Sequence, residues 1–175
     1  MVLIRKANKE DYLDIANIHF TSWNLAYSSL LPKSYIAQEN DLSYKMKMWK
    51  EVMAHPNASI CIAYDSRDGN NDTNLGFIAC FNKGNNYEIT ALYVLPEYQR
   101  LGIGSQLMHV ALNNIHDINS SLSLWVLRDN VSAVSFYKKH GFVNSKEINE
   151  ELYEDTKIVD IMMVKNPPYI KNMKG

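Results

Sequence analysis

The 175-residue chain has little of what marks a secreted, membrane-spanning or nucleic-acid-binding protein. Its two cysteines are too few for a disulfide framework and lack the spacing to histidine or aspartate that predicts a metal site. Since no apolar run could cross a bilayer and the first residues lack the apolar core of a signal peptide, we expect a cytoplasmic protein without membrane contact. A net charge of -1 gives no general attraction to nucleic acid. Any attraction for a charged ligand must therefore come from a local site.

Length and composition predict one domain that covers residues 1–175. The 46% hydrophobic and 21% charged residues are ordinary for a globular protein, and the length is enough to bury one full core. We find no linker, internal repeat or low-complexity segment. The last residues, 166–175, are expected to form a flexible tail.

Hydrophobic spacing predicts an α+β fold of six to seven strands and about four helices. The predicted strands are 2–6, 58–64, 75–82, 86–95, 121–127, 142–148 and 157–165. The predicted helices follow Asn8, which forms a capping box with Asp11, then Ser34, then Gly102 up to residue 118, and Val131. The first strands are antiparallel neighbours, and a strand–helix–strand–helix–strand unit follows. We therefore expect a mixed, mostly antiparallel sheet with helices on both faces.

The stretch VLPEYQRLGIGSQL (94–107) places two glycines between a predicted strand and a predicted helix. Free backbone N–H groups at a helix start bind anions, and glycine lets a ligand approach the main chain closely. The first turn of a helix normally favours acidic side chains, yet no acid occurs between Glu97 and Asp117. The missing negative charge indicates that a bound anion supplies it.

Two common phosphate-binding motifs do not fit this stretch. A dinucleotide fingerprint needs a third glycine at position 107, where the chain has leucine. A nucleoside triphosphate loop needs a lysine directly after the second glycine, but Ser105 follows Gly104. Both nucleotide-binding classes are therefore disfavoured.

Two motifs within residues 86–142 resemble those of the GCN5-related N-acetyltransferase (GNAT) family. Gln99-Arg100-Leu101-Gly102-Ile103-Gly104 matches the signature Gln/Arg-x-x-Gly-x-Gly/Ala, and WVLRDNVSAVSFYKKHGF (125–142) is similar to a later family motif. The resemblance implies a three-layer α/β/α sandwich and direct acetyl transfer from acetyl-CoA to a primary amine, with no metal. A looser resemblance, at Trp23, Tyr27, Leu31-Pro32 and Tyr35, is to the bacterial polyamine N-acetyltransferase branch.

The resemblance also assigns cofactor contacts. It places the pyrophosphate of coenzyme A on Arg100, Leu101, Gly102, Ile103, Gly104 and Ser105, and the pantetheine arm along Leu92, Tyr93 and Val94. A backbone N–H near Leu92 would then face the acetyl carbonyl. For this arrangement the strand before the glycines must part from strand 121–127 and leave backbone groups unpaired. Asn130 would bind the pantetheine or its phosphate arm, or would only cap the helix that follows.

Two residues are candidates for proton transfer. Tyr137 resembles the family's general acid, which protonates the departing thiolate, although it could simply pack beside Phe136. By the period of two, Glu88 shares a strand face with Thr90, Leu92 and Val94. A carboxylate at this position resembles the general base of the family's histone-acetylating members, which makes Glu88 a candidate base. The alternatives for Glu88 are a salt-bridged surface residue or a water that removes the proton.

The acceptor side is less specified by the sequence. We take Trp23, Tyr27, Tyr35 and Glu88 as candidate acceptor contacts. The acidic stretch EINEELYED (147–155) either attracts a cationic acceptor or is a solvated loop between the last two strands. The expected partner is a small-molecule or peptide amine, with no nucleic acid, and a homodimer is one option. A non-catalytic acyl-CoA-binding or sensor module on the same fold is the alternative function.

Overall fold

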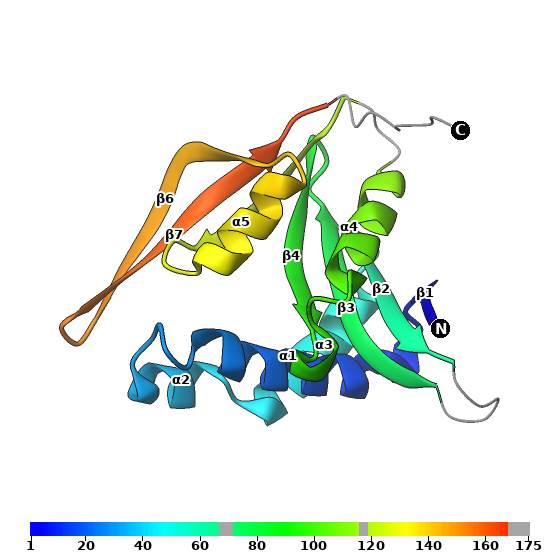
Figure 1. The fold of residues 1–175 in the computed structure, drawn as a ribbon, viewed down its shortest axis with the longest axis horizontal. Coiled ribbons are helices and arrows are strands. Elements are labelled where there is room, and N and C mark those ends of the chain that lie inside the picture. The colour runs from blue at the N-terminus through cyan, green and yellow to red at the C-terminus, as the bar shows by residue number, and fades with distance from the viewer. Residues whose placement is uncertain (67–71, 116–118, 168–175) are drawn as a thin grey trace.

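A seven-stranded mixed sheet forms the middle of the molecule (Figure 1). The structure is a computed structural model that describes residues 1–66, 72–115 and 119–167. The strands are β1 (Val2–Lys6), β2 (Ala58–Asp65), β3 (Thr73–Asn82), β4 (Asn86–Val94), β5 (Ser121–Leu127), β6 (Val143–Tyr153) and β7 (Thr156–Lys165). The α-helices are α1 (Tyr12–Tyr27), α2 (Lys33–Glu39), α3 (Leu42–Ala54), α4 (Ile103–Asn113) and α5 (Val131–Lys139), and short 3-10 turns span Lys9–Asp11 and Pro96–Tyr98.

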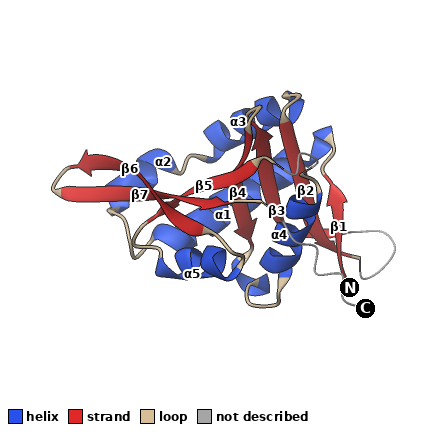
Figure 2. Cartoon of the chain, turned by 90° about the horizontal axis from the view of Figure 1, so that it is seen from above, coloured by secondary structure: helices blue, strands red, loops and turns tan. Residues whose placement is uncertain are grey.

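The strand order is β1-β2-β3-β4-β5-β7-β6. Only the central pair β4–β5 is parallel among the described strands, and the other neighbours are antiparallel. Figure 2 shows α4 and α5 together on one side of the sheet, with α3 on the other. The predicted three-layer α+β architecture is therefore confirmed.

Each face of the sheet carries its own hydrophobic core. On the α4 and α5 side, Leu107 and Met108 of α4 are fully buried against strand residues such as Leu124. On the α1 and α3 side, Ile15 and Trp49 pack over strand residues that include Phe77. The helical spacing of apolar residues in the sequence sets these two faces, since residues three and four apart lie on one side of a helix.

The predicted second helix is wrong in one respect, because two helices occupy its place. α2 ends at Asn40, and Asp41 starts α3 by accepting a hydrogen bond from the Tyr44 backbone N–H at 2.6 Å. The Asn40 side chain also donates to the Phe20 carbonyl at 3.0 Å, which ties the break to α1. Residues 1–66, 72–115 and 119–167 therefore contain five α-helices, where about four were expected, because two polar side chains interrupt a continuous apolar pattern.

The acidic stretch also differs from the prediction. Residues 147–153 belong to β6, and only Glu154 and Asp155 form the turn into β7. The solvated-loop interpretation is therefore wrong for most of the stretch. The predicted tail lies outside the described residues from position 168 onward, and the predicted end of the helix after Gly102, at 116–118, also lies outside them.

The first helix cap, the two cysteines and the helix lengths complete the description of the fold. The capping box of Asn8 and Asp11 is present as predicted. Cys61 and Cys80 are free thiols on neighbouring strands. Within the described residues, no helix is both long enough and apolar enough to cross a membrane.

Candidate active site

The parallel strands β4 and β5 part after a short paired segment. Their pairing runs from Asn86 opposite Ser121 to Ile89 opposite Leu124 and does not continue further along the described strands. The Leu95 N–H bonds to the Leu75 carbonyl of β3 at 2.8 Å, so alternation turns the backbone groups of Leu92 and Val94 away from β3. They face the side from which β5 has departed, as an added strand-like ligand would require.

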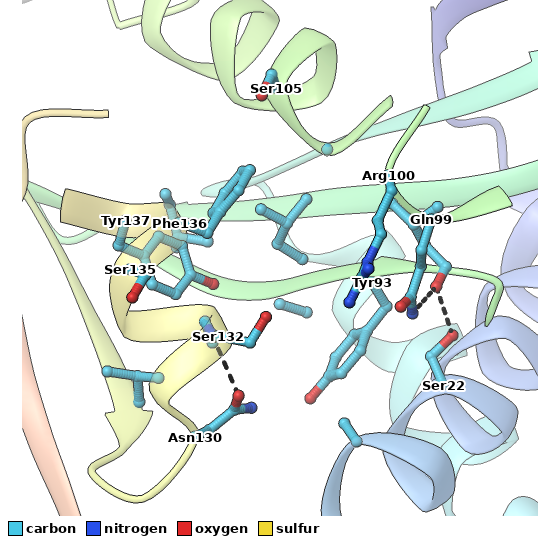
Figure 3. A pocket seen from close by; sticks show the side chains of 18 of the residues that line it. Ser22, Tyr93, Gln99, Arg100, Ser105, Asn130, Ser132, Ser135, Phe136 and Tyr137 are labelled. Carbon is cyan, nitrogen blue, oxygen red and sulfur yellow. Dashed lines mark hydrogen bonds between the residues drawn. The ribbon is translucent and has the colours of Figure 1, made fainter. Parts of the chain in front are cut away.

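A cleft of about 710 Å³ lies at this split (Figure 3). Its walls come from α1, β4, β5, the glycine loop and α5. The sequence-predicted cofactor residues that line it are Leu92, Tyr93, Val94, Arg100, Gly102, Gly104, Ser105, Asn130 and Tyr137. Leu101, which is 65% exposed, and Ile103, which is buried in the core, do not line it. The structure therefore gathers most of the predicted set around one cavity.

The glycine loop opens α4 without any side-chain cap. Gly102 precedes the helix with φ of +82°, a left-handed conformation that suits glycine, and Arg100 adopts φ of +62° despite its side chain. Figure 3 shows the Arg100 side chain pointing into the cleft beside Tyr93. Free N–H groups at the start of α4, no acid in its first turn and a nearby guanidinium together fit a bound phosphate group.

The carbonyl of Val94 joins the glycine loop to α1. Gln99 Nε2 donates to this oxygen at 3.0 Å and Ser22 Oγ donates at 3.3 Å (Figure 3). Ser22 is 2% exposed. Sequence reasoning did not identify Ser22, although a buried serine on the apolar face of a predicted helix was a signal that could have found it.

Asn130 and Tyr137 lie near opposite ends of α5. Asn130 Oδ1 accepts from the Ala133 N–H at 3.2 Å, so it caps the helix while lining the cleft. Tyr137 is half-buried and makes edge contacts with Phe136 and Phe142 at ring-centroid distances of 5.4 and 5.8 Å. Burial raises the pKa of Tyr137, so its phenol is protonated at neutral pH. Tyr137 can therefore pack its ring against Phe136 and Phe142 and still offer its hydroxyl as a proton donor.

Glu88 does not share a face with Leu92 and Val94, contrary to the prediction. The pairing with β3 shifts between Ala79 opposite Ala91 and Cys80 opposite Ile89, so β4 contains one extra residue there. This bulge reverses the alternation of side chains. The Glu88 carboxylate lies 3.6 Å from Lys83 Nζ, and Glu88 is not among the residues that line the cleft.

The candidate acceptor residues are only partly assembled at the cleft. Tyr27 lines the cleft. Trp23 packs against Tyr27 with tilted ring planes at a centroid distance of 4.7 Å, and Lys45 Nζ lies 5.3 Å from the centre of the Trp23 ring. Tyr35 lies on α2 and donates to Glu151 Oε2 at 3.1 Å. The cleft lining contains neither Trp23 nor Tyr35.

Asp160 is an acidic side chain near the cleft that the sequence analysis missed. Asp160 of β7 lies opposite Leu127 of β5. Two residues further along β7, Met162 lies opposite the cleft-lining Trp125. Because alternate residues of a strand share a face, these four side chains lie on one face of the sheet. Within the described residues the Asp160 carboxylate has no hydrogen bond or ion pair. Burial raises its pKa, and nearby Glu151 adds to the rise. The signal in the sequence was an acidic residue, Asp160, within the otherwise apolar predicted strand 157–165.

His19 of α1 packs against the cleft-lining Tyr93. His19 Nδ1 accepts a hydrogen bond from Trp49 Nε1 at 3.0 Å, and its ring stacks on the cleft-lining Tyr93 at 4.7 Å. Burial lowers the pKa of His19 to about 3, and Lys45 adds to the lowering. His19 is therefore neutral at physiological pH and packs with the buried face of α1.

Comparison with known proteins agrees with this geometry. The acetyltransferase (GNAT) domain model matches residues 56–144. The chain is 31% identical over 157 residues to an uncharacterized N-acetyltransferase, YuaI, of Bacillus subtilis, covering 87% of this chain and 86% of that protein. It is 31% identical over 143 residues to a spermidine N(1)-acetyltransferase of Thermoplasma acidophilum, covering 79% and 86%. A solved structure of PaiA N-acetyltransferase from Thermoplasma acidophilum with coenzyme A has a TM-score of 0.77 at 24% identity, covering 95% and 99%.

The cleft has the parts that coenzyme A needs. The glycine loop offers main-chain donors for phosphate, and the freed edge of β4 offers backbone groups for an amide-containing arm. The described residues contain no cluster of ligands that could hold a metal ion. The protein is accordingly an enzyme whose acyl donor is acetyl-CoA, and the chain belongs to the GNAT family of N-acetyltransferases.

Proposed function

We propose that this acetyltransferase acts on the primary amine of a small, linear, cationic compound such as a polyamine, in the cytoplasm. The observation that carries the proposal is the Asp160 carboxylate, which is half-buried and has no partner among the described residues. It shares a sheet face with the cleft-lining Trp125. The likeness to a relative named spermidine N(1)-acetyltransferase supports the same class of acceptor.

A cationic acceptor would satisfy the electrostatics of this region. Burial raises the pKa of Tyr27, and the Asp160 carboxylate adds to that rise, so the two groups are close enough to interact. An ammonium group beside Asp160 would stabilise the ionised carboxylate and bring its pKa down again. A second cationic centre along the acceptor would therefore anchor it while its first amine reaches the cleft.

The cofactor, when bound, supplies an acetyl group activated as a thioester. In our proposal the N–H groups at the start of α4, with Arg100, hold the phosphates, and the freed edge of β4 aligns the arm. The Leu92 N–H is directed at the acetyl carbonyl and stabilises negative charge on its oxygen. Tyr137 Oη–H would donate its proton to the sulfur as the carbon–sulfur bond breaks and the amine nitrogen bonds to the acetyl carbon. The proton that this nitrogen then loses would pass through water and restore the phenol.

The acceptor amine must lose a proton before it attacks, since alkyl ammonium groups titrate near ~10. Either Glu88 or a water molecule could remove this proton. The pairing of Glu88 with Lys83 and its absence from the cleft lining favour water.

Thiol release from acetyl-CoA, measured with a panel of amines, tests the proposal. We expect spermidine and linear diamines to have higher kcat/KM than monoamines of equal length. Asp160→Asn should raise KM for spermidine by about tenfold, the scale of one paired charge, and should change KM for a monoamine much less. Asp155→Asn, in the exposed β6–β7 turn, is the matched control for charge alone. Equal effects of both variants, or no preference for diamines, would contradict the proposal.

A further inference from the structure

The cleft is closed at one end by the paired part of β4 and β5. The last pair between these two strands is Ile89 opposite Leu124, and Ile89 already lines the cleft. Beyond this pair the strands are parted, and Ala91 of β4 and Val126 of β5 line the cleft. The side chains of Ile89, Ala91 and Val126 are all buried. We call these three apolar residues the closed end of the cleft.

Hydrogen bonds from two side chains hold the strands at the closed end in place. Ser123 of β5 is buried and donates from its Oγ to the Tyr87 carbonyl of β4 at 3.3 Å. Thr90, the extra residue of the β4 bulge, donates from its Oγ1 to the Ala79 carbonyl of β3 at 3.4 Å. These bonds add to the backbone ladder between β4 and β5. Lengthening the cleft at this end would therefore require breaking several hydrogen bonds at once.

Packed side chains also bound the closed end on both faces of the sheet. On the α4 and α5 side, Ile89 and Val126 belong to the same hydrophobic core, and Tyr137 packs against that core. On the α1 and α3 side, Ala91 belongs to the other core, and Tyr93 packs against it. Figure 3 shows Tyr93 and Tyr137 entering the cleft from β4 and from α5. Neither face therefore offers the closed end open space into which a ligand could extend.

The donor's acyl group would be directed at this end of the cleft. In the proposed mechanism the arm runs along β4 from the glycine loop past Val94, and the Leu92 N–H is directed at the acetyl carbonyl. A carbonyl carbon is planar, with its three bonds about 120° apart. If the oxygen lies toward β4 and the sulfur toward Val94, the third bond points away from the glycine loop. Each carbon added to an acetyl group would therefore be pushed toward the closed end.

We propose that the closed end is the acyl site of this enzyme and that Ile89 and Val126 restrict the donor to a short acyl chain. This inference rests on the placement of the donor in the proposed function, but it does not depend on which amine is the acceptor. A packed apolar site accommodates an added methylene poorly, because its side chains must shift to make room. One surplus methylene in such a site lowers kcat/KM by roughly 10- to 200-fold. We expect propionyl-CoA to be used about tenfold less efficiently than acetyl-CoA, and butyryl-CoA about hundredfold less.

The test enlarges the closed end with Ile89→Ala and Val126→Ala and fills it with Ala91→Val. The first readout is the ratio of kcat/KM for butyryl-CoA to that for acetyl-CoA, with any amine that wild type acetylates. The fraction of active enzyme cancels in this ratio, so a loss of stability does not change it. We expect both enlarging variants to raise the ratio by about tenfold or more, and Ala91→Val to lower it. Ile62→Ala is the matched control, because Ile62 is fully buried on β2 and does not line the cleft, so its ratio should stay at the wild-type value.

Calorimetry gives a second readout that needs no acceptor. Wild type should bind butyryl-CoA about tenfold or more weakly than acetyl-CoA, and Ile89→Ala should narrow this difference in Kd. Both ratios unchanged in both enlarging variants would overturn the inference, as would a wild type that binds and uses the two donors equally well. A wild type that acetylates monoamines as well as spermidine would contradict the proposed acceptor class, while the donor ratios would still decide the role of the closed end.

Discussion

The two sides of the cleft are built in different ways. The cofactor side uses the glycine loop, the freed edge of β4 and the start of α5, where the groups that face the ligand are mostly main-chain atoms. The proposed acceptor side instead depends on side chains, namely Tyr27 of α1, which lines the cleft, and Asp160 of β7, which shares a sheet face with the cleft-lining Trp125. Main-chain recognition depends on local conformation, whereas side-chain recognition depends on which distant segments meet.

This difference explains why the two sides are specified so unequally. A common cofactor requires one fixed geometry, which a short motif with glycines at set positions can provide. The proposed acceptor side depends on single side chains, which can change without disturbing the glycine loop or the freed edge of β4. We therefore expect mutations on the cofactor side to affect every substrate, and those on the acceptor side to affect some.

The largest effect is expected at Tyr137, where the two sides meet. Tyr137→Phe keeps the ring that packs on Phe136 and Phe142 but removes the proton donor. We expect kcat to fall by ~10²–10⁴-fold with every amine, while the Kd for acetyl-CoA stays near wild type. Steady-state kinetics and calorimetry measure the two quantities separately. Tyr44→Phe, at a site that is mostly exposed, is the control. An unchanged kcat would mean that Tyr137 serves only in packing.

A second prediction concerns His19, which connects the α1–α3 core to the cleft. Its pKa is lowered to about 3 in the folded state, against ~6.5 when unfolded. The unfolded chain therefore binds a proton first as pH falls, and the stability from neutral His19 is fully present above pH ~6.5 and lost below it. The loss should approach about 1.4 kcal/mol per pH unit between pH ~6 and the folded-state pKa.

Urea unfolding of wild type and His19→Gln at several pH values checks this prediction. Glutamine can still accept from Trp49 but does not titrate. The variant's free energy of unfolding should depend less steeply on pH below ~6.5 than that of wild type. Parallel curves for the two proteins would show that His19 does not govern this pH range.

The cofactor side can be disturbed without unfolding the protein at Gly104. A Cβ at this position would lie 3.4 Å from Phe136 of α5, so a methyl group fits but a branched side chain presses on α5 and the cleft. We expect Gly104→Val to raise the Kd for acetyl-CoA by about tenfold or more, and Gly104→Ala to raise it less. Gly84→Ala is the control, because it strains a left-handed turn away from the cleft. Similar Kd values for all three would contradict the phosphate-binding role of the loop.

The smallest effect is expected at Glu88. The β4 bulge and the ion pair with Lys83 place its carboxylate away from the residues that line the cleft. Glu88→Gln should therefore lower kcat by less than about threefold and leave the acidic limb of the pH–rate profile, where a general base titrates, in place. A drop of ~10²-fold with a shifted profile would restore Glu88 as the base and exclude the water route.

The sequence by itself determined what depends on neighbours along the chain. The glycine loop, the caps at Asn8 and Asn130 and the apolar faces of the helices follow from backbone dihedral preferences and hydrogen bonds within a few residues. The order of the predicted strands and helices gave a mixed sheet with helices on both faces, and the family resemblance implied the three-layer fold and the parting of β4 from β5. Most of the cofactor residues that the resemblance assigned line the cleft.

Only the tertiary structure decided what depends on distant partners. One extra residue in β4 turns Glu88 to the other face, and that bulge exists only in the pairing with β3. Asp160 became a candidate acceptor contact only because it shares a sheet face with Trp125 and interacts electrostatically with Tyr27 of α1. Glu151 likewise has a hydrogen-bond partner, Tyr35 of α2, that only the fold brings near it. Contacts over such separations follow from packing and strand register, which no local preference encodes. The residues of the proposed acceptor side could therefore be recognised only in three dimensions.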